Sequence, residues 1–387
     1  MSKSNDQTKP LSETVFHNEL MRLKRGSITK RHFLQSTGLG LATAVFAREL
    51  ALGSSAFAAT PDLGKKMSLA TWPNYHDPAN LEAFTKATGV AVAMNVFGSN
   101  EEMLAKLQAG GSGWDVFVPT NYTISTYVKL GLIEPLDLSK VPNFDKGQFD
   151  KRFTSEGTIA GKTYGIPKNW GTTGFVVSSQ KLKMPLASWK DFWDVTMKEA
   201  SGRVVVHDYQ LTTIGNALKY YGYSFNSNDP KELAKAEALL IKAKPHLFAI
   251  SSDYQPAMRS GDAWLSICWN GDGTQLNKDL PHMKYVIARE GGEIWSDFYA
   301  IPKDSKNKAA AYALINFLLD PSVNAKEVMA HGYPTADARV NKLLPKSVLE
   351  NSIVFPAKEF LTPLEFGAAA TLTNPLRAEI MARFKSA

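Results

Sequence analysis

Residues 67–122 read MSLATWPNYHDPANLEAFTKATGVAVAMNVFGSNEEMLAKLQAGGSGWDVFVPTNY, and two hydrophobic patterns alternate along them. Short apolar runs typical of strands occupy residues 67–71, 90–96 and 115–119. Apolar side chains at helical spacing occupy residues 77–89 and 100–109. Strands that alternate with helices predict an α/β fold with a mostly parallel sheet. In such folds, ligands contact the loops at the carboxyl ends of the strands.

Aromatic and hydroxyl side chains follow two of these strands directly. Trp72 and Tyr75 come after the first strand, and Thr120 and Tyr122 come after the third. Packing is the less favoured alternative for each aromatic ring, because all four side chains stand where ligand-binding loops are expected.

Two pairs of an aromatic residue and an acid lie within residues 264–302, namely Trp269 with Asp272 and Trp295 with Asp297. An indole face attracts a cation, and a carboxylate adds a charge-assisted hydrogen bond. Residues 265–269 are predicted to form a strand, and residues 270–273, Asn-Gly-Asp-Gly, are predicted to end it in a turn. The alternative to a ligand-binding role is that both tryptophans are core residues and both aspartates are turn or capping residues. The recurrence of the pair favours a pocket for an organic cation.

The composition places limits on the function. A chain of 387 residues with 44% hydrophobic and 21% charged residues predicts two or three globular domains. Residues 1–58 hold eight Lys or Arg against four Asp or Glu, so most of the net charge of +7 lies there and nucleic-acid binding is not favoured. The single cysteine, Cys268, is predicted to be a buried apolar residue, and neither a metal site nor a cofactor is indicated.

The N-terminal segment has the form of an export signal. Basic residues at 30–31 precede an apolar run at 38–47, and Ala56-Phe57-Ala58 predicts cleavage near Ala58 and a periplasmic location. Residues 1–58 resemble a twin-arginine signal with Lys30 in place of the first arginine, so general secretion stays open as the route. An uncleaved anchor is a further alternative.

Seven segments together resemble the periplasmic spermidine/putrescine-binding proteins of ABC transporters. The segments are LATWPNYHDPANLEAFTKATG, SNEEMLAKLQAGGSGWDVFVPTNY, YGIPKNWGTTGF, WNGD, EGGEIWSDFYAIP, KNKAAAYALINFLLDP and HGYPTADA, in this order over residues 67–345. The resemblance implies the two-lobed type II periplasmic-binding-protein fold, each lobe a mixed, mostly parallel sheet flanked by helices, with a ligand held between the lobes. It implies one lobe at 66–172 plus 292–340 and the other at 176–288 plus 345–387. The chain would cross between them near 171–178, 288–292 and 337–343.

The same resemblance implies the site residues. The expected ligand-binding set is Trp72, Tyr75, Thr120, Tyr122, Asp208, Trp269, Asp272, Trp295, Asp297 and Tyr333. It also implies a polyamine ligand, an ABC permease as partner and a monomer.

Three departures from the family pattern bear on the ligand. No acid stands three residues after Asp208, where Leu211 is found, so one amine contact is expected to be missing. Pro73 replaces a serine or threonine and removes a backbone donor. An expected glutamine is absent near residue 362, where only Glu365 is a substitute.

Other motifs are interpreted structurally. Tyr220-Tyr221 resembles an iron-binding tyrosine pair, but helix packing is the favoured interpretation. His207 is expected to be a structural histidine, and the glycines of residues 110–113 lack the lysine of a phosphate-binding loop. No nucleophile motif is evident, but catalytic groups need not be adjacent in sequence, so this alone does not exclude an enzyme. The resemblance implies a receptor rather than an enzyme. The alternatives are a receptor for another nitrogenous cation or an amino-acid-derived solute, a sensor, and an enzyme that uses Asp272 and Asp297 as acid and base.

Overall fold

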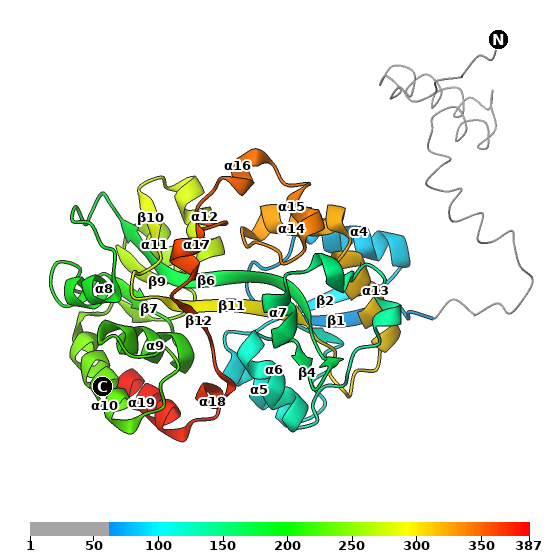
Figure 1. Cartoon of the computed structure of the whole chain (residues 1–387), viewed down its shortest axis with the longest axis horizontal. Coiled ribbons are helices and arrows are strands. Elements are labelled where there is room, and N and C mark those ends of the chain that lie inside the picture. Colours follow the sequence, from blue (N-terminus) through cyan, green and yellow to red (C-terminus); the bar gives the residue numbers. More distant parts are fainter. Residues whose placement is uncertain (1–61) are drawn as a thin grey trace, which may run out of the picture. The chain divides into compact units, whose positions relative to one another are not determined.

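The first part of the fold is a small parallel sheet of order β2-β1-β3 (Figure 1). The computed structural model describes residues 62–387. The strands are β1 (Lys66–Thr71), β2 (Ala91–Val96) and β3 (Val116–Phe117), and the intervening helices are α4 (Pro78–Thr88) and α5 (Asn100–Gln108). Helix α4 begins where the Asp77 side chain accepts a hydrogen bond from the Ala79 N–H, and it ends at Gly89, whose φ of 77° suits glycine. The predicted βαβαβ order of this region is confirmed.

A larger mixed sheet has the order β12-β11-β6-β9-β7-β8, with β10 also paired to β6. Its strands are β6 (Ile166–Ser178), β7 (Val204–Val206), β8 (Ala249–Ile250), β9 (Leu265–Trp269), β10 (Met283–Val286), β11 (Gly292–Tyr299) and β12 (Leu364–Phe366). Strand β6 runs antiparallel to β9, β10 and β11, whereas β7 pairs in parallel with β8 and β9. A short hairpin of two strands of two residues each, β4 (Thr158–Ile159) and β5 (Lys162–Thr163), forms a separate sheet.

Strands β6 and β11 connect the two halves of the molecule. All thirteen residues of β6 are buried, and β11 is buried along its whole length. Figure 1 shows both strands running from the helices around α9 to the helices around α6 and α13. Isolated bridges of Phe117 to Ala300 and of Thr120 to Asp297 join β11 and the residue after it to the end of the small parallel sheet. Residues on β11 therefore face both halves.

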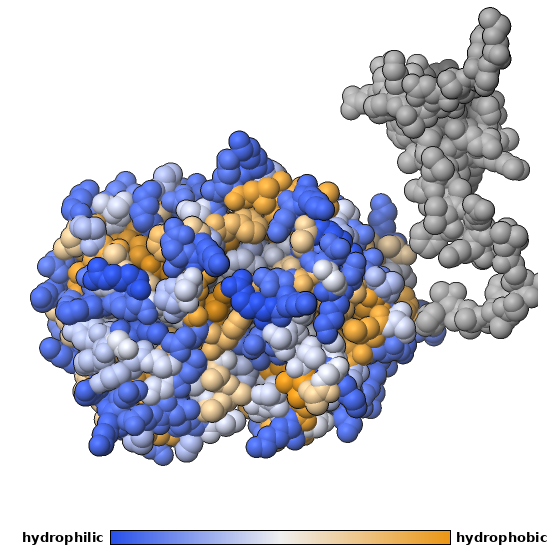
Figure 2. All heavy atoms as spheres, in the orientation of Figure 1, coloured by the Kyte–Doolittle hydropathy of each residue, from blue (hydrophilic) through white to orange (hydrophobic). Residues whose placement is uncertain are grey.

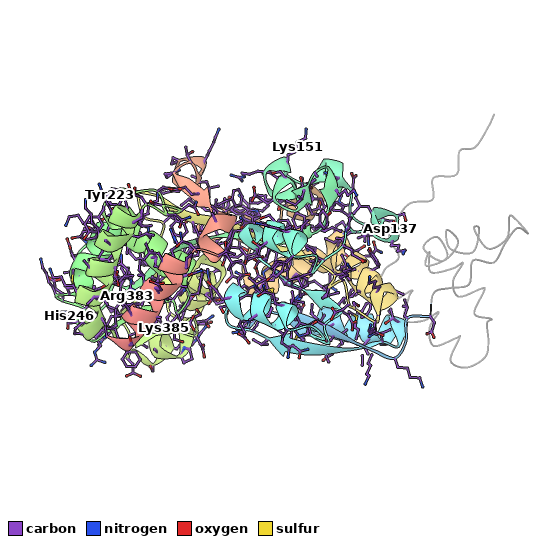
Figure 3. The ribbon with its side chains drawn as sticks, turned by 90° about the horizontal axis from the view of Figure 1, so that it is seen from below. Asp137, Lys151, Tyr223, His246, Arg383 and Lys385 are labelled. Atoms are coloured by element: carbon purple, nitrogen blue, oxygen red, sulfur yellow. The ribbon has the colours of Figure 1, made fainter. Side chains whose placement is uncertain are left out.

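The remaining helices cover the two sheets. They are α6 (Asn121–Lys129), α7 (Lys151–Glu156), α8 (Trp189–Thr196), α9 (Gln210–Tyr220), α10 (Pro230–Ala243), α11 (Gln255–Ser260), α12 (Asn270–Asp279), α13 (Lys308–Leu318), α14 (Pro321–His331), α15 (Ala338–Asn341), α16 (Lys346–Leu349), α17 (Lys358–Leu361), α18 (Ala369–Leu372) and α19 (Pro375–Ser386). The C-terminal helix α19 lies against α10, where Arg383 pairs with Glu237 at 2.5 Å (Figure 3).

Two large hydrophobic cores form on either side of the connecting strands. The buried residues of the first core come from 67–170 and 294–336, and those of the second come from 175–288 and 380–384. Each core combines segments that are far apart in the sequence, because the chain passes from one half to the other and back. The boundaries implied by the resemblance, 66–172 plus 292–340 and 176–288 plus 345–387, stay predictions.

One local prediction is wrong. Residues 270–273 do not form a turn, because α12 begins at Asn270 directly after β9. The two glycines serve close packing, since a Cβ at Gly271 would lie 2.4 Å from the ring of Tyr333 and one at Gly273 would lie 2.7 Å from the ring of Tyr285. Asp272 stands in the first turn of α12, where the helix dipole favours an acid.

Polar residues cover most of the face shown in Figure 2, and the apolar residues on it form separate patches. None of the helices in residues 62–387 is long and apolar enough to cross a membrane. The predicted export signal lies outside the described residues. Cys268 is fully buried, as expected, and Tyr220 donates a hydrogen bond to Asp194 at 2.9 Å.

Candidate functional site

One cavity of about 210 Å³ opens between the two halves. Its lining includes all ten residues of the expected ligand-binding set: Trp72, Tyr75, Thr120, Tyr122, Asp208, Trp269, Asp272, Trp295, Asp297 and Tyr333. Most of them follow the carboxyl ends of β1, β3, β7 and β9, and two lie on β11. The structure thus brings these side chains together, while their contact with a ligand stays a prediction.

Aromatic rings form much of the wall of this cavity. Trp72 and Trp269 approach each other with ring centroids 6.2 Å apart, and Tyr333 lies 5.1 Å from Trp295 and 5.3 Å from Tyr75. His207 is fully buried behind Trp269, with the two ring centroids 4.5 Å apart, and within residues 62–387 neither of its ring nitrogens has a hydrogen-bond partner. Burial lowers the pKa of His207 to about 3, so it is neutral near pH 7.

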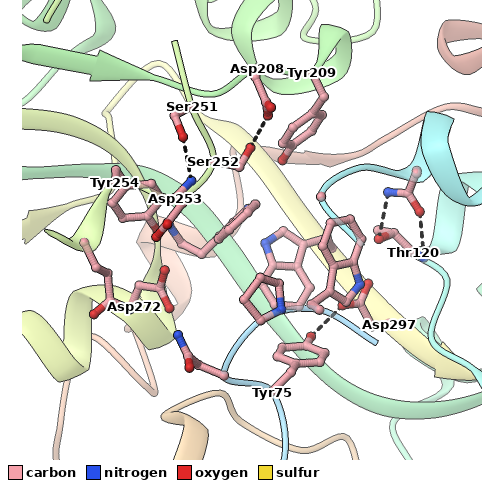
Figure 4. Close-up of a pocket in the computed structure, with 18 of the residues that line it drawn as sticks. Tyr75, Thr120, Asp208, Tyr209, Ser251, Ser252, Asp253, Tyr254, Asp272 and Asp297 are labelled. Atoms are coloured by element: carbon pink, nitrogen blue, oxygen red, sulfur yellow. Dashed lines mark hydrogen bonds between the residues drawn. The ribbon is translucent and has the colours of Figure 1, made fainter. Parts of the chain in front are cut away.

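Asp297 is the most constrained acid in the cavity. It is 4% exposed, and its Oδ2 accepts a hydrogen bond of 2.5 Å from the Tyr75 hydroxyl (Figure 4). Within residues 62–387, its Oδ1 is buried without a hydrogen-bond partner. Burial raises the pKa of Asp297 to about 6, although the hydrogen bond from Tyr75 and the nearby polar side chain of Thr120 offset part of the shift. The site therefore holds a carboxylate oxygen to which no residue of 62–387 donates a hydrogen bond.

Two other predicted acids face the cavity from the second half. Burial raises the pKa of Asp272, whose Oδ1 accepts a hydrogen bond of 3.4 Å from Tyr333. Asp208 is only partly buried and accepts a hydrogen bond from Ser252 (Figure 4). Glu365 does not line the cavity, because it pairs with Lys219 at 2.6 Å elsewhere. The expectation that Glu365 substitutes for the missing glutamine is therefore wrong.

Ten residues that line the cavity were not singled out from the sequence, namely Asn74, Gly98, Asn100, Tyr209, Ser251, Ser252, Asp253, Tyr254, Gln255 and Glu293. The segment 251–255 follows β8, which pairs in parallel with β7, so its position beside Asp208 follows from strand order. Glu293 lies two residues before Trp295 on β11, and alternate residues of a strand share one face. That periodicity was a usable signal for Glu293.

A buried charge network lies behind Tyr75. The Lys168 Nζ is 4.2 Å from the centre of the Tyr75 ring and 3.8 Å from the Glu327 carboxylate. Glu327 also accepts a hydrogen bond from His76 at 3.0 Å, and it accepts others from the Asp77 backbone and the Asn80 amide. Burial lowers the pKa of Lys168 to about 8. This network fixes the first loop, which carries Tyr75 into the cavity.

The geometry of two halves around one acidic, aromatic cavity can be compared with known proteins. Residues 79–353 match the family described as bacterial extracellular solute-binding protein. The chain belongs to this family. The solute-binding protein accordingly has the two-lobed type II fold expected from its sequence.

Named relatives share most of the chain. The putrescine-binding periplasmic protein of Pseudomonas aeruginosa is 32% identical over 327 residues, which cover 81% of this chain and 89% of the relative. The spermidine/putrescine-binding periplasmic protein of Escherichia coli is 34% identical over 334 residues, which cover 84% of this chain and 93% of the relative. A solved structure described as a putative spermidine/putrescine ABC transporter from Listeria monocytogenes superimposes with a TM-score of 0.76 at 28% identity, covering 83% and 99%.

Proposed function

We propose that this solute-binding protein captures a polyamine of the putrescine or spermidine type in the cavity between its lobes. The observation that supports this best is the carboxylate of Asp297, which lines the cavity among aromatic rings and whose Oδ1 has no hydrogen-bond partner in residues 62–387. A buried charge without a partner is costly, and an ammonium group supplies both a counter-charge and hydrogen-bond donors. The names of the relatives agree with this ligand class.

The lining residues divide between charge and enclosure. Asp297 and Asp272 pair with ammonium groups, and Asp208 contributes from the second lobe. The methylene chain is an apolar segment between two charges, and it packs against flat rings at little cost in hydration. The enclosing side chains are Trp72, Tyr75, Tyr122, Trp269, Trp295 and Tyr333, with the Thr120 hydroxyl beside Asp297.

The same proposal covers transport. After removal of an export signal near Ala58, the periplasmic monomer closes its lobes, 66–172 plus 292–340 and 176–288 plus 345–387, around the amine and delivers it to an ABC permease. The family consists of solute-binding proteins, and we assign this chain no catalytic activity.

A second ligand class is favoured by one observation. The Nε1 of Trp295 is buried without a partner in the described part of the chain, and it is a donor that an ammonium group cannot satisfy. An amino-acid-derived cation carries a carboxylate that would accept this hydrogen bond. Titration with matched pairs, such as putrescine and ornithine, separates the two classes, because only the second member offers the acceptor.

Isothermal titration of the purified protein with putrescine, cadaverine, spermidine and spermine tests the proposal. We expect one-to-one binding of at least one amine, with an affinity that weakens as salt screens the charge interactions. Binding of none of them, with retained binding of an amino-acid-derived cation, would replace the polyamine with the second class. Conversion of any of these compounds to a product would contradict the receptor role.

A further inference from the structure

Glu293 extends the row of cavity-facing residues on β11. Residues 293, 295 and 297 share one face of the strand, and all three line the cavity. The β11–β6 register is regular from Glu293, opposite Thr173, to Asp297, opposite Asn169. The face therefore presents an acid, an indole and a second acid in sequence.

The environment of Glu293 leaves one oxygen open. Its side chain is 2% exposed, and its Oε2 accepts hydrogen bonds from Thr173 at 2.6 Å and Thr212 at 3.5 Å. Over residues 62–387, its Oε1 has no hydrogen-bond partner, and Glu293 is one of the residues that line the cavity. No Lys, Arg or His within this range forms an ion pair with Glu293. The carboxylate thus faces the cavity without a counter-ion from the described part of the chain.

A structural role explains only part of this arrangement. The Thr212 hydroxyl lies in the first turn of α9, where a helix dipole favours an anion. Yet burial and, to a lesser extent, the nearby carboxylate of Asp297 together raise the pKa of Glu293 to about 7. Two buried acids that repel each other are better accommodated when cations bind between them.

The spacing of the two acids sets the length of a matching ligand. Four residues of strand, at about 3.3 Å each, separate their Cα atoms by about 13 Å. With each ammonium about 2.8 Å from its carboxylate, nitrogens about 7 to 13 Å apart reach both. An extended chain advances about 1.2 Å per bond, so the end nitrogens of putrescine lie about 6 Å apart and those of spermidine about 11 Å apart.

We propose that Glu293 is a second amine-binding carboxylate, which pairs with the far ammonium of a triamine whose near ammonium contacts Asp297. This inference rests on the proposed polyamine function and deepens it, because it makes spermidine-length ligands preferred over diamines. Trp295 lies between the acids and packs against the methylene segment between the two charges.

Titration of Glu293→Gln with spermidine and putrescine tests the assignment. The amide oxygen of glutamine still accepts hydrogen bonds from Thr173 and Thr212, so only the charge is removed. Loss of a charge-assisted contact predicts a spermidine affinity about ten- to a hundredfold weaker, and a loss at least ten times larger than the loss for putrescine. Glu359→Gln, at an exposed position on α17, is the matched control and should change neither affinity.

The outcomes are distinct. A selective loss of spermidine affinity, with an unchanged thermal midpoint of the ligand-free protein or a raised one, supports the assignment. Equal losses for both amines, or no loss, overturn it even though polyamine binding itself persists. If the unaltered protein binds neither amine, that result alone refutes the proposed polyamine function, and with it the assignment of Glu293.

Discussion

Replacement of Asp297 by Asn should nearly abolish amine binding. The substitution keeps the shape of the side chain but removes the charge from a residue that is 4% exposed. A buried ammonium that loses its carboxylate costs roughly 2–5 kcal/mol, which corresponds to a Kd about 30-fold to several thousandfold higher. Calorimetric titration measures this change, with Asp279→Asn on the exposed end of α12 as the control.

The pH dependence of binding provides a second signature of Asp297. Its pKa of about 6 in the free protein means that a cation must displace a proton below this pH, so affinity should fall about tenfold per pH unit there. The other groups that face the Asp297 carboxyl are Tyr75, Thr120, Lys168 and Glu293. Because Glu293 has a pKa of about 7, its protonation makes the dependence of affinity on pH steeper in the same range. The Asn variant should keep only the slope from Glu293.

The stability of the ligand-free protein should change in the opposite direction to binding. Because the pKa of Asp297 is raised on folding, the native state binds more protons than the unfolded state, and stability falls as pH rises from about 4 to 6. Above pH 6 this penalty is complete and amounts to as much as about 3 kcal/mol. Asp297→Asn should therefore raise the urea midpoint at pH 7. An unchanged Kd together with an unchanged midpoint would refute the assignment of Asp297 to the site.

Three further predictions concern the support of the cavity. Glu327→Gln leaves Lys168 buried without its anion and should lower the free energy of unfolding at pH 7 by about 3–5 kcal/mol. Because the pKa of Glu327 is lowered on folding, this contribution is present above about pH 4.5 and declines as pH falls, so urea titrations of both proteins should converge in acid. Gly271→Ala drives a Cβ into the ring of Tyr333 and should cost about 1–3 kcal/mol in the same assay. Trp269→Leu removes an indole face and should weaken amine binding by about 0.5–2 kcal/mol in calorimetric titration.

Matched controls keep these results interpretable. Glu350→Gln breaks an exposed i,i+4 pair and should cost less than about 0.5 kcal/mol. Gly98→Ala introduces a Cβ whose nearest atom is 3.7 Å away, so it should be tolerated. If the Gly271 variant is as stable as the Gly98 variant, the Tyr333 ring can move aside for the added Cβ. If the Trp269 variant binds the amine with unchanged affinity, the indole does not contact the ligand.

The alternating strands and helices of residues 67–122 were predictable because each element carries its own signal, such as Gly89 at the end of α4. The start of α12 was not predictable, because the sequence Asn-Gly-Asp-Gly favours a turn. The helix forms there because Tyr333 and Tyr285 pack on Gly271 and Gly273. Tertiary contacts here override local preference.

The site shows the same division. Residues at strand ends, such as Tyr75 and Trp269, could be placed from local pattern and resemblance. Lys168 could not, because a lysine is mostly exposed and its neighbours Pro167 and Asn169 give no sign that it will be 2% exposed beside Glu327 on a helix far along the chain. Glu293 was predictable from strand periodicity alone, which shows that an acid at the right phase deserves the same weight as one in a recognised motif.

The sealed position of Cys268 has a practical consequence for spectroscopy. It is the single thiol of the sequence, it is 0% exposed, and burial raises its pKa well above the usual range, so it will not react with maleimide dyes in the native state. Cysteines introduced at exposed positions on α10 and α13 can therefore be labelled without removing the native residue. A donor and acceptor attached there would convert lobe closure into an energy-transfer signal, and the protein into an optical reporter of its own solute.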